Sequence, residues 1–109
     1  MIAVIFEVWP KDGHLDDYLD IAHGLRPQLE KIDGFISIER FSSMYEDGKL
    51  LSLSIWRDEA AVQAWREQID HRAAQAKGRH ELFANYRLRV AEIRRDYGPT
   101  DRDQAPDDF

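Results

Sequence analysis

The chain has 109 residues, of which 43% are hydrophobic and 33% are charged, so its length and composition fit one globular domain. It contains no cysteine, which excludes disulfides, thiolate metal sites and cysteine nucleophiles. The net charge of −6 argues against a nucleic-acid binder, because such proteins carry an excess of basic residues. The N-terminal apolar run is short and no basic segment precedes it. We therefore predict a strand there rather than a signal peptide or membrane span, and a cytoplasmic location.

The first part of the chain shows a strand pattern followed by a helix pattern. Ile2 to Trp9 is apolar on both of its alternating faces, which predicts a strand covered on both sides. From His14 to Lys31, apolar residues recur at spacings of three and four, which predicts an amphipathic helix. Pro27 lies inside this pattern and should kink or split the helix near Leu25.

The second part begins with a hairpin and repeats the helix–strand pattern. Phe35 to Ser42 and Leu50 to Trp56 are predicted strands, joined by a loop that contains the turn signal Asp47-Gly48. A second helix is predicted from the N-cap Asp58 to Lys77, and a last strand from about Phe83 to Arg95. The buried stripe predicted for this second helix consists of Val62, Trp65, Ile69 and Ala76, with Ala73 nearby.

The order β-α-β-β-α-β predicts an α+β, ferredoxin-like fold with an antiparallel sheet. We assign residues 1–97 to this domain and residues 98–109 to a disordered acidic C-terminal tail, because that segment is rich in Asp and Pro. Helices are expected on one face of the sheet only, which leaves an apolar face for a partner. We therefore predict a homodimer in which two sheets pack face to face and enclose a pocket.

Several short motifs in this order resemble those of the antibiotic-biosynthesis-monooxygenase family, whose members form dimeric α/β barrels. No single motif is specific, but together they cover about Ile2 to Tyr97. The motifs are Trp9-Pro10, Gly34-Phe35, the segment from Leu53 to Asp58, Trp65, His71 to Ala74, Gly78-Arg79, and the stretch from Phe83 to Arg95.

The resemblance implies a monooxygenase that acts on a small aromatic, quinol or polyketide-like substrate with dioxygen, without metal, flavin or another cofactor. The family also includes haem-degrading relatives, which use an Asn on strand one, a Trp on helix two and a later His. Here Trp65 matches, but Glu7 stands at the Asn position and Gln75 at the His position. Haem binding or degradation is therefore an alternative, and a non-catalytic dimer that binds a small ligand is another.

Oxygenation without a cofactor requires a base that deprotonates the substrate, so that the resulting anion can reduce dioxygen. We predict catalytic roles for His71, mainly because of the family resemblance, and for Glu7. On a straight helix His71 lies about 120° from Trp65, off the buried stripe, so a surface position is the alternative. Glu7 lies in an apolar strand, so it should either face a pocket or pair with Arg87 or Arg89.

The predicted substrate-binding residues are polar or aromatic side chains on these elements. Ser52 and Ser54 interrupt an apolar strand and could line a wet cavity or lie at an edge. Trp65 could form a pocket wall or belong to the core. Trp9 and Tyr86, which lie in segments that carry the resemblance, complete the set. No pair of histidines has the spacing of a metal site, so none is predicted.

Overall fold

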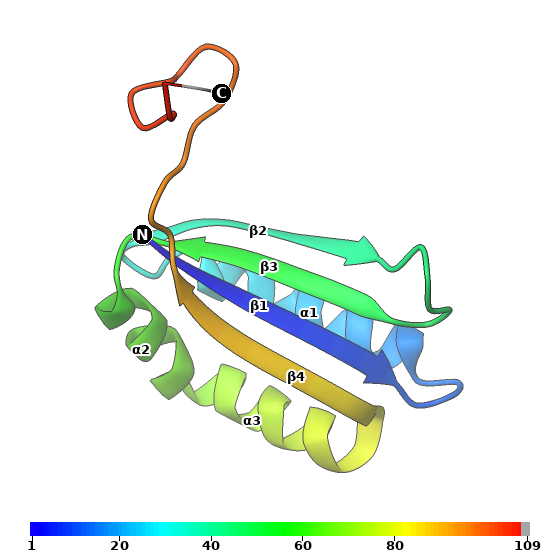
Figure 1. Cartoon of the computed structure of the whole chain (residues 1–109). Coiled ribbons are helices and arrows are strands. Elements are labelled where there is room, and N and C mark those ends of the chain that lie inside the picture. The colour runs from blue at the N-terminus through cyan, green and yellow to red at the C-terminus, as the bar shows by residue number, and fades with distance from the viewer. Residues whose placement is uncertain (108–109) are drawn as a thin grey trace.

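A computed structural model describes residues 1–107, which form a four-stranded antiparallel sheet with helices on one side (Figure 1). The elements are β1 (Ile2–Pro10), α1 (Leu15–Leu29), β2 (Phe35–Ser42), β3 (Leu50–Trp56), α2 (Glu59–Glu67), α3 (Ile69–Lys77), the π-helical turn η1 (Gly78–Leu82) and β4 (Phe83–Glu92). The strand order is β2-β3-β1-β4, so β1 and β3 are the central strands. The predicted α+β, ferredoxin-like fold is confirmed.

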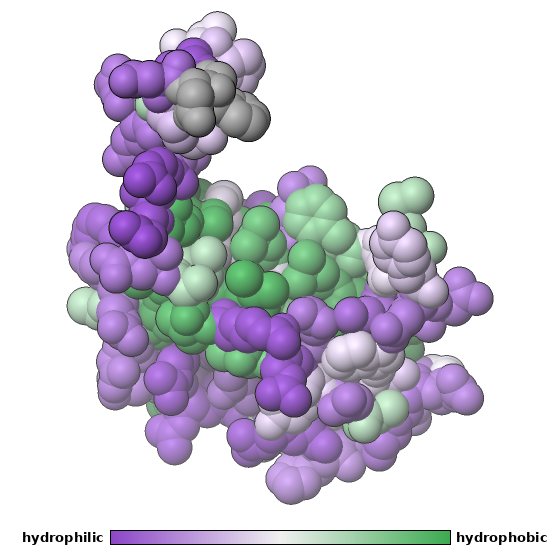
Figure 2. Space-filling model, in the orientation of Figure 1, coloured by the Kyte–Doolittle hydropathy of each residue, from purple (hydrophilic) through white to green (hydrophobic). Residues whose placement is uncertain are grey.

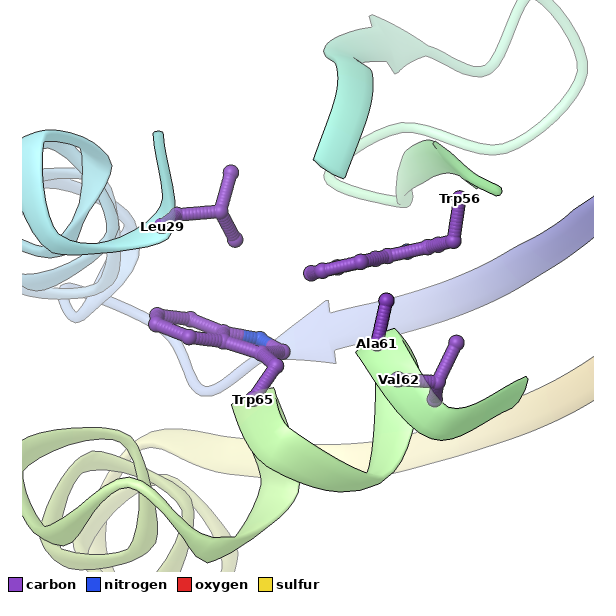
Figure 3. Close-up of a cluster of buried hydrophobic side chains, with 5 residues drawn as sticks. All are labelled: Leu29, Trp56, Ala61, Val62 and Trp65. Atoms are coloured by element: carbon purple, nitrogen blue, oxygen red, sulfur yellow. The ribbon is translucent and has the colours of Figure 1, made fainter. Parts of the chain in front are cut away.

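The helices bury one face of the sheet, which we call the helix face. The register places Ile2 beside Trp56 and Val8 beside Leu50, so these four side chains share that face. Two apolar clusters lie at its two ends. The first comprises Leu29, Trp56, Ala61, Val62 and Trp65 (Figure 3), and the second comprises Val8, Tyr18, Leu50 and Leu82. Burial of these side chains is the main force that docks the helices on the sheet.

Two buried polar residues lie between the clusters on the helix face. Ser52 and Ser54 are buried on β3 between the two clusters. The Trp56 indole N–H donates a 2.9 Å hydrogen bond to the hydroxyl of Ser54, so neither buried group is left without a partner. Ser54 therefore orients a core indole.

A tight corner fixes the start of α2. The guanidinium of Arg57 donates two 3.1 Å hydrogen bonds to Asp33 and one of 2.9 Å to Asp58. Asp58 in turn caps α2 by accepting from the backbone N–H of Ala61 at 2.9 Å. Gly34 has φ +94°, and a Cβ placed on it would lie 2.7 Å from the Cβ of Ala61. This corner therefore requires glycine for both its conformation and its space.

The prediction of a single second helix is wrong in one respect, because the structure forms two separate helices over this segment. Gln68 interrupts it with an extended backbone (φ −64°, ψ 129°), and α3 starts in a new direction. Ile69, predicted on the buried stripe, is consequently 78% exposed. The last strand also ends earlier than predicted, at Glu92. In contrast, α1 continues through Pro27 without the predicted split.

The other face of the sheet, which we call the open face, carries no helix. Figure 2, drawn in the orientation of Figure 1, shows hydrophobic surface across the middle of the sheet with hydrophilic side chains along its border. Ile5, Leu53 and Ile55 are half-buried on this face, and Phe41 at its margin is 42% exposed. The prediction that β1 is covered on both sides is therefore not met within one chain.

Residues beyond β4 extend away from the sheet (Figure 1). The described part of this segment is held by local hydrogen bonds, such as that from the Asp96 backbone N–H to the Gln104 side chain at 2.8 Å. The disordered tail predicted for residues 98–109 stays a prediction, and residues 108–109 lie outside the described part. Among residues 1–107, no helix has the length and apolar character needed to cross a membrane.

We expect Gly34→Ala to destabilise the fold more than Gly48→Ala does. Both glycines have positive φ, so alanine costs about 1–2 kcal/mol at either position through backbone conformation. Only Gly34 also faces a side chain, whereas a Cβ at Gly48 meets nothing within 4 Å. Urea unfolding of the two variants measures the difference. Equal losses would contradict the steric part of this argument.

Candidate active site between strand β4 and helices α2 and α3

An apolar strip of β4 lies on the helix face without being covered by helices. It consists of Tyr86, Leu88 and Val90, which are 42%, 45% and 48% exposed. Their neighbours on β1 are Val8, Phe6 and Val4. Figure 1 shows α2 and α3 displaced towards the β4 side of the sheet. The strip is therefore an apolar surface beside these helices, suited to contact a small apolar ligand.

Trp65 and His71 lie on the same side of the sheet as this strip. Their rings stack, with centroids 4.1 Å apart and an angle of 16° between the planes. Trp65 is buried in the first apolar cluster, so the imidazole rests against a fixed wall. The surface position that a straight helix implies for His71 is wrong, because the interruption at Gln68 rotates α3 and brings the ring onto Trp65.

The tautomer of His71 follows from its hydrogen bond. Nδ1 lies 2.9 Å from the backbone carbonyl oxygen of Trp65. A carbonyl oxygen only accepts, so Nδ1 carries the proton and donates. In the neutral ring Nε2 then holds the lone pair, and it forms no hydrogen bond within residues 1–107. His71 therefore presents a basic nitrogen at its outer edge.

The surroundings keep His71 neutral. Burial lowers the pKa of the imidazole, and the positive charge of Arg66 lowers it further, while the hydrogen bond to Trp65 has the opposite effect. Because the net direction is downward, the ring is the free base at neutral pH. A neutral imidazole with an open Nε2 can accept a proton from an acidic O–H or C–H group.

Gln68, which the sequence analysis did not single out, positions His71. Its side-chain oxygen accepts from the backbone N–H of His71 at 2.7 Å and so caps α3. Its side-chain nitrogen donates to the Gln28 side chain on α1 at 2.8 Å. Gln68 therefore fixes the interruption through one hydrogen bond to α3 and one to α1. Glutamine is not a typical N-cap and no Gly or Pro marks the position, so the sequence carries no recognisable signal.

The predicted site residues divide between the two faces of the sheet. Trp65, His71 and Tyr86 lie on the helix side, with Tyr86 in the uncovered strip. Ser52 and Ser54 are also on this face, but within the core between the clusters. Glu7 and Trp9 lie on the open face, and the structure does not bring them together with His71.

Glu7 is held by two cations. Its carboxylate lies 2.8 Å from Lys49 Nζ and 2.8 Å from the guanidinium of Arg89. The hydrogen bond from Lys49 and the charges of both partners lower the pKa of Glu7, although partial burial opposes them. The arginine pairing left open by the sequence is therefore present, with Arg89 rather than Arg87. A carboxylate stabilised in this way is a weak base, which favours a structural role for Glu7, and its catalytic role stays a prediction.

Trp9 belongs to the same group of side chains on the open face. Its indole N–H donates to the Glu46 carboxylate at 2.7 Å, and Lys49 Nζ lies 4.7 Å from its ring centroid. These contacts tie β1 to the β2–β3 hairpin. Trp9 therefore lies on the open face, on the opposite side of the sheet from His71.

The residues present do not fit a metal or a haem. No group of three or more His, Asp or Glu side chains in residues 1–107 is placed to hold a metal ion. Of the three positions important in haem-degrading relatives, Glu7 lies on the opposite face of the sheet from Trp65. The third position holds Gln75, an amide that is not a typical axial ligand of haem iron. We therefore derive no step through haem.

The fold and the site define a ferredoxin-like protein with a neutral histidine on the same side of the sheet as an uncovered apolar strip, and comparison with known proteins places it further. The family model described as antibiotic biosynthesis monooxygenase matches residues 1–77. The chain belongs to this family.

Two relatives are similar in sequence. A protein of Pyricularia oryzae named jasmonate monooxygenase ABM is 47% identical over 93 residues, which cover 85% of this chain and 43% of that protein. The uncharacterised protein YqjZ of Bacillus subtilis is 36% identical over 62 residues, 57% of this chain and 53% of that protein. The chain thus spans about half the length of these relatives.

Solved structures share the fold at low sequence identity. Rv0793 from Mycobacterium tuberculosis superposes with a TM-score of 0.80 at 17% identity, covering 89% of this chain and 98% of that one. A variant of SnoaB, described as a cofactor-independent oxygenase from Streptomyces nogalater, gives 0.75 at 10% identity, covering 87% and 94%. At such identities the likeness concerns the fold alone.

Glu7→Gln tests the structural role of the ion pairs. A carboxylate whose pKa is lowered by folding stabilises the protein above its unfolded pKa, about 4.3, and this stabilisation is lost as the pH falls through the folded pKa. We expect Glu7→Gln to be less stable than the wild type at pH 7, and the gap to close in acid. Urea unfolding at several pH values measures it.

Glu39→Gln is the matched control, because Glu39 is exposed on the same face and makes no ion pair within residues 1–107. It should change stability little at any pH. A Glu7→Gln protein with unchanged stability but lost turnover would contradict the structural role and support the catalytic one.

Proposed function

We propose that this protein is a monooxygenase that oxygenates a small, acidic, ring-containing substrate with dioxygen and no cofactor, and that His71 is the base. Membership of the monooxygenase family supports the reaction class. The observation that carries the role of His71 is its geometry: Nδ1 is held by the Trp65 carbonyl, and Nε2 is open and unprotonated.

The chemistry requires only a base and dioxygen. Nε2 of His71 takes a proton from the substrate, and the resulting anion passes one electron to dioxygen to give a substrate radical and superoxide. The two combine at carbon, and the peroxide anion takes the proton back from the imidazole. Loss of water from this hydroperoxide leaves a carbonyl group, so the substrate CH₂ and O₂ become C=O and H₂O. The histidine is regenerated and no further reductant is consumed.

The substrate class follows from this requirement and from the apolar strip on the same side of the sheet as the base. The substrate must form a stabilised anion, as a quinol or an enolisable cyclic ketone does, because only such an anion is a sufficient reductant. Tyr86, Leu88 and Val90 offer apolar contact for its ring. Small aromatic and polyketide-like quinols meet both conditions. Jasmonate, a cyclic ketone named in the 47% identical relative, is a second compound to test.

His71→Gln should lower kcat by about 10² to 10⁴-fold and leave the fold intact, because glutamine cannot accept the proton. The wild type should also lose turnover as the pH falls through the lowered pKa of His71, and the variant should lack this acid limb. Oxygen uptake with a panel of quinols and cyclic ketones measures both effects.

The control variant is His80→Gln, which changes an exposed histidine outside this site. Equal activity of the wild type and His71→Gln would contradict the proposed base. Saturable ligand binding without oxygen uptake would favour the non-catalytic alternative. A stoichiometric Soret shift on addition of hemin would favour the haem alternative.

We further propose that the open face pairs with the open face of a second copy. This arrangement supplies the missing cover for Ile5, Leu53 and Ile55, which one chain leaves partly in water. In a symmetric pairing both copies use the same surface, so one apolar face per chain is enough to form the interface. The polar contacts of Glu7 and Lys49 would lie at the border of the buried area.

Light scattering should give about twice the 12.8 kDa of one chain. Leu53→Glu should shift the protein to a monomer, because a dimer would bury the new charges without partners. Gln63→Glu, at an exposed position on α2, is the control, and this variant should stay dimeric. A wild-type monomer at micromolar concentration would rule out this pairing.

A further inference from the structure

A second surface feature lies on the outer side of α2 and α3, away from the sheet. It is a hollow of about 640 Å³ that spans both helices and η1. Its lining residues are Gln63, Arg66, Glu67, Ile69, Arg72, Ala73, Gln75, Ala76 and Arg79. Neither the family assignment nor the proposed oxygenation uses this hollow.

Three arginines line the hollow without being neutralised. Within residues 1–107, the guanidinium groups of Arg66, Arg72 and Arg79 form no hydrogen bond or ion pair. The one acidic residue in the lining, Glu67, accepts a 2.9 Å hydrogen bond from Gln63. A concentration of free positive charge is unexpected on a chain whose net charge is −6. Such a concave patch attracts anions.

The arrangement of the side chains suits a compact oxyanion. Arg72 and Arg79 are seven residues apart, two turns along one side of α3 and η1, and Arg66 approaches from α2. Ala73 and Ala76 lie between them and leave room for a ligand close to the helix. Each guanidinium is a rigid fork that matches phosphate oxygens in pairs. Three forks around one hollow fit a group that carries at least two negative charges.

We propose that this hollow is a binding site for the phosphate or diphosphate group of a small molecule, held by Arg66, Arg72 and Arg79. The ligand contacts the outer side of the helices, whereas His71 and the apolar strip lie on the inner side. The two sites therefore share no lining residue, although the charge of Arg66 acts on His71, and the existence of the anion site does not depend on the proposed oxygenation.

Calorimetric titration at low salt tests the site with two probes, inorganic pyrophosphate and phenyl phosphate. We expect saturable 1:1 binding of at least one probe to the wild type. The double variant Arg72→Gln/Arg79→Gln should weaken that binding at least about tenfold, because two charge-assisted contacts are lost. Binding that weakens as salt is added should accompany this result.

The matched control is Arg94→Gln/Arg95→Gln, which removes the same charge from two exposed arginines outside the hollow. It should bind the probes like the wild type. All four substitutions replace exposed side chains, and thermal melting verifies that both proteins fold. The proposal is overturned if neither probe binds below about 10 mM, or if the control loses as much affinity as the double variant.

Discussion

Trp65 links the core of this protein to its candidate active site. One part of the indole packs against Leu29 and Trp56 in the first apolar cluster, and His71 stacks on it. The backbone carbonyl of the same residue fixes the His71 tautomer. Trp65 therefore sets the plane of the imidazole and determines which of its nitrogens is protonated. Because Trp65 is buried in the core, its own position is fixed. A base held in this way needs no reorganisation before it accepts a proton.

The one-sided packing of the sheet divides the molecule into two chemical environments. On the helix face, two apolar clusters flank the buried Ser52 and Ser54 and leave the β4 strip uncovered. On the open face, apolar residues are bordered by the paired charges of Glu7, Lys49 and Arg89. Since side chains of a strand alternate between faces, adjacent residues such as Phe6 and Glu7 serve different environments. A polar residue in an apolar strand is therefore not by itself evidence of a pocket.

The sequence predicts most of the fold because the elements obey simple periods. Alternation identifies the strands, and the spacing of three and four identifies both helical regions. The order of elements then leaves few topologies, and the ferredoxin-like prediction is confirmed. The end of β4 is missed because the residues after Glu92 keep a strand-like composition without a partner strand.

The candidate site is harder to predict from the sequence than the fold, because it depends on the interruption of the helix at Gln68. A continuous helix through Gln68 keeps Ile69 on the stripe and His71 away from it, whereas the interrupted helix reverses both positions. The signal for the interruption is a side-chain contact between Gln68 and Gln28, forty residues apart. Period and composition describe neighbours along the chain, so they cannot report such a contact. The sequence limits one partner of Glu7 to Arg87 or Arg89 and does not indicate the other, Lys49, because register is a property of the assembled sheet.

The interruption also divides the helical layer into parts of unequal stability. α2 has three buried residues and a start fixed by Asp58, whereas α3 has no fully buried residue and is held at its beginning by the side chain of Gln68. Local opening needs the least free energy where the fewest apolar contacts are lost. α3 should therefore open more readily than α2, and its backbone amides should exchange with solvent sooner than those of α2. Because α3 carries His71, such opening would separate the imidazole from Trp65 without disturbing the core on which Trp65 rests.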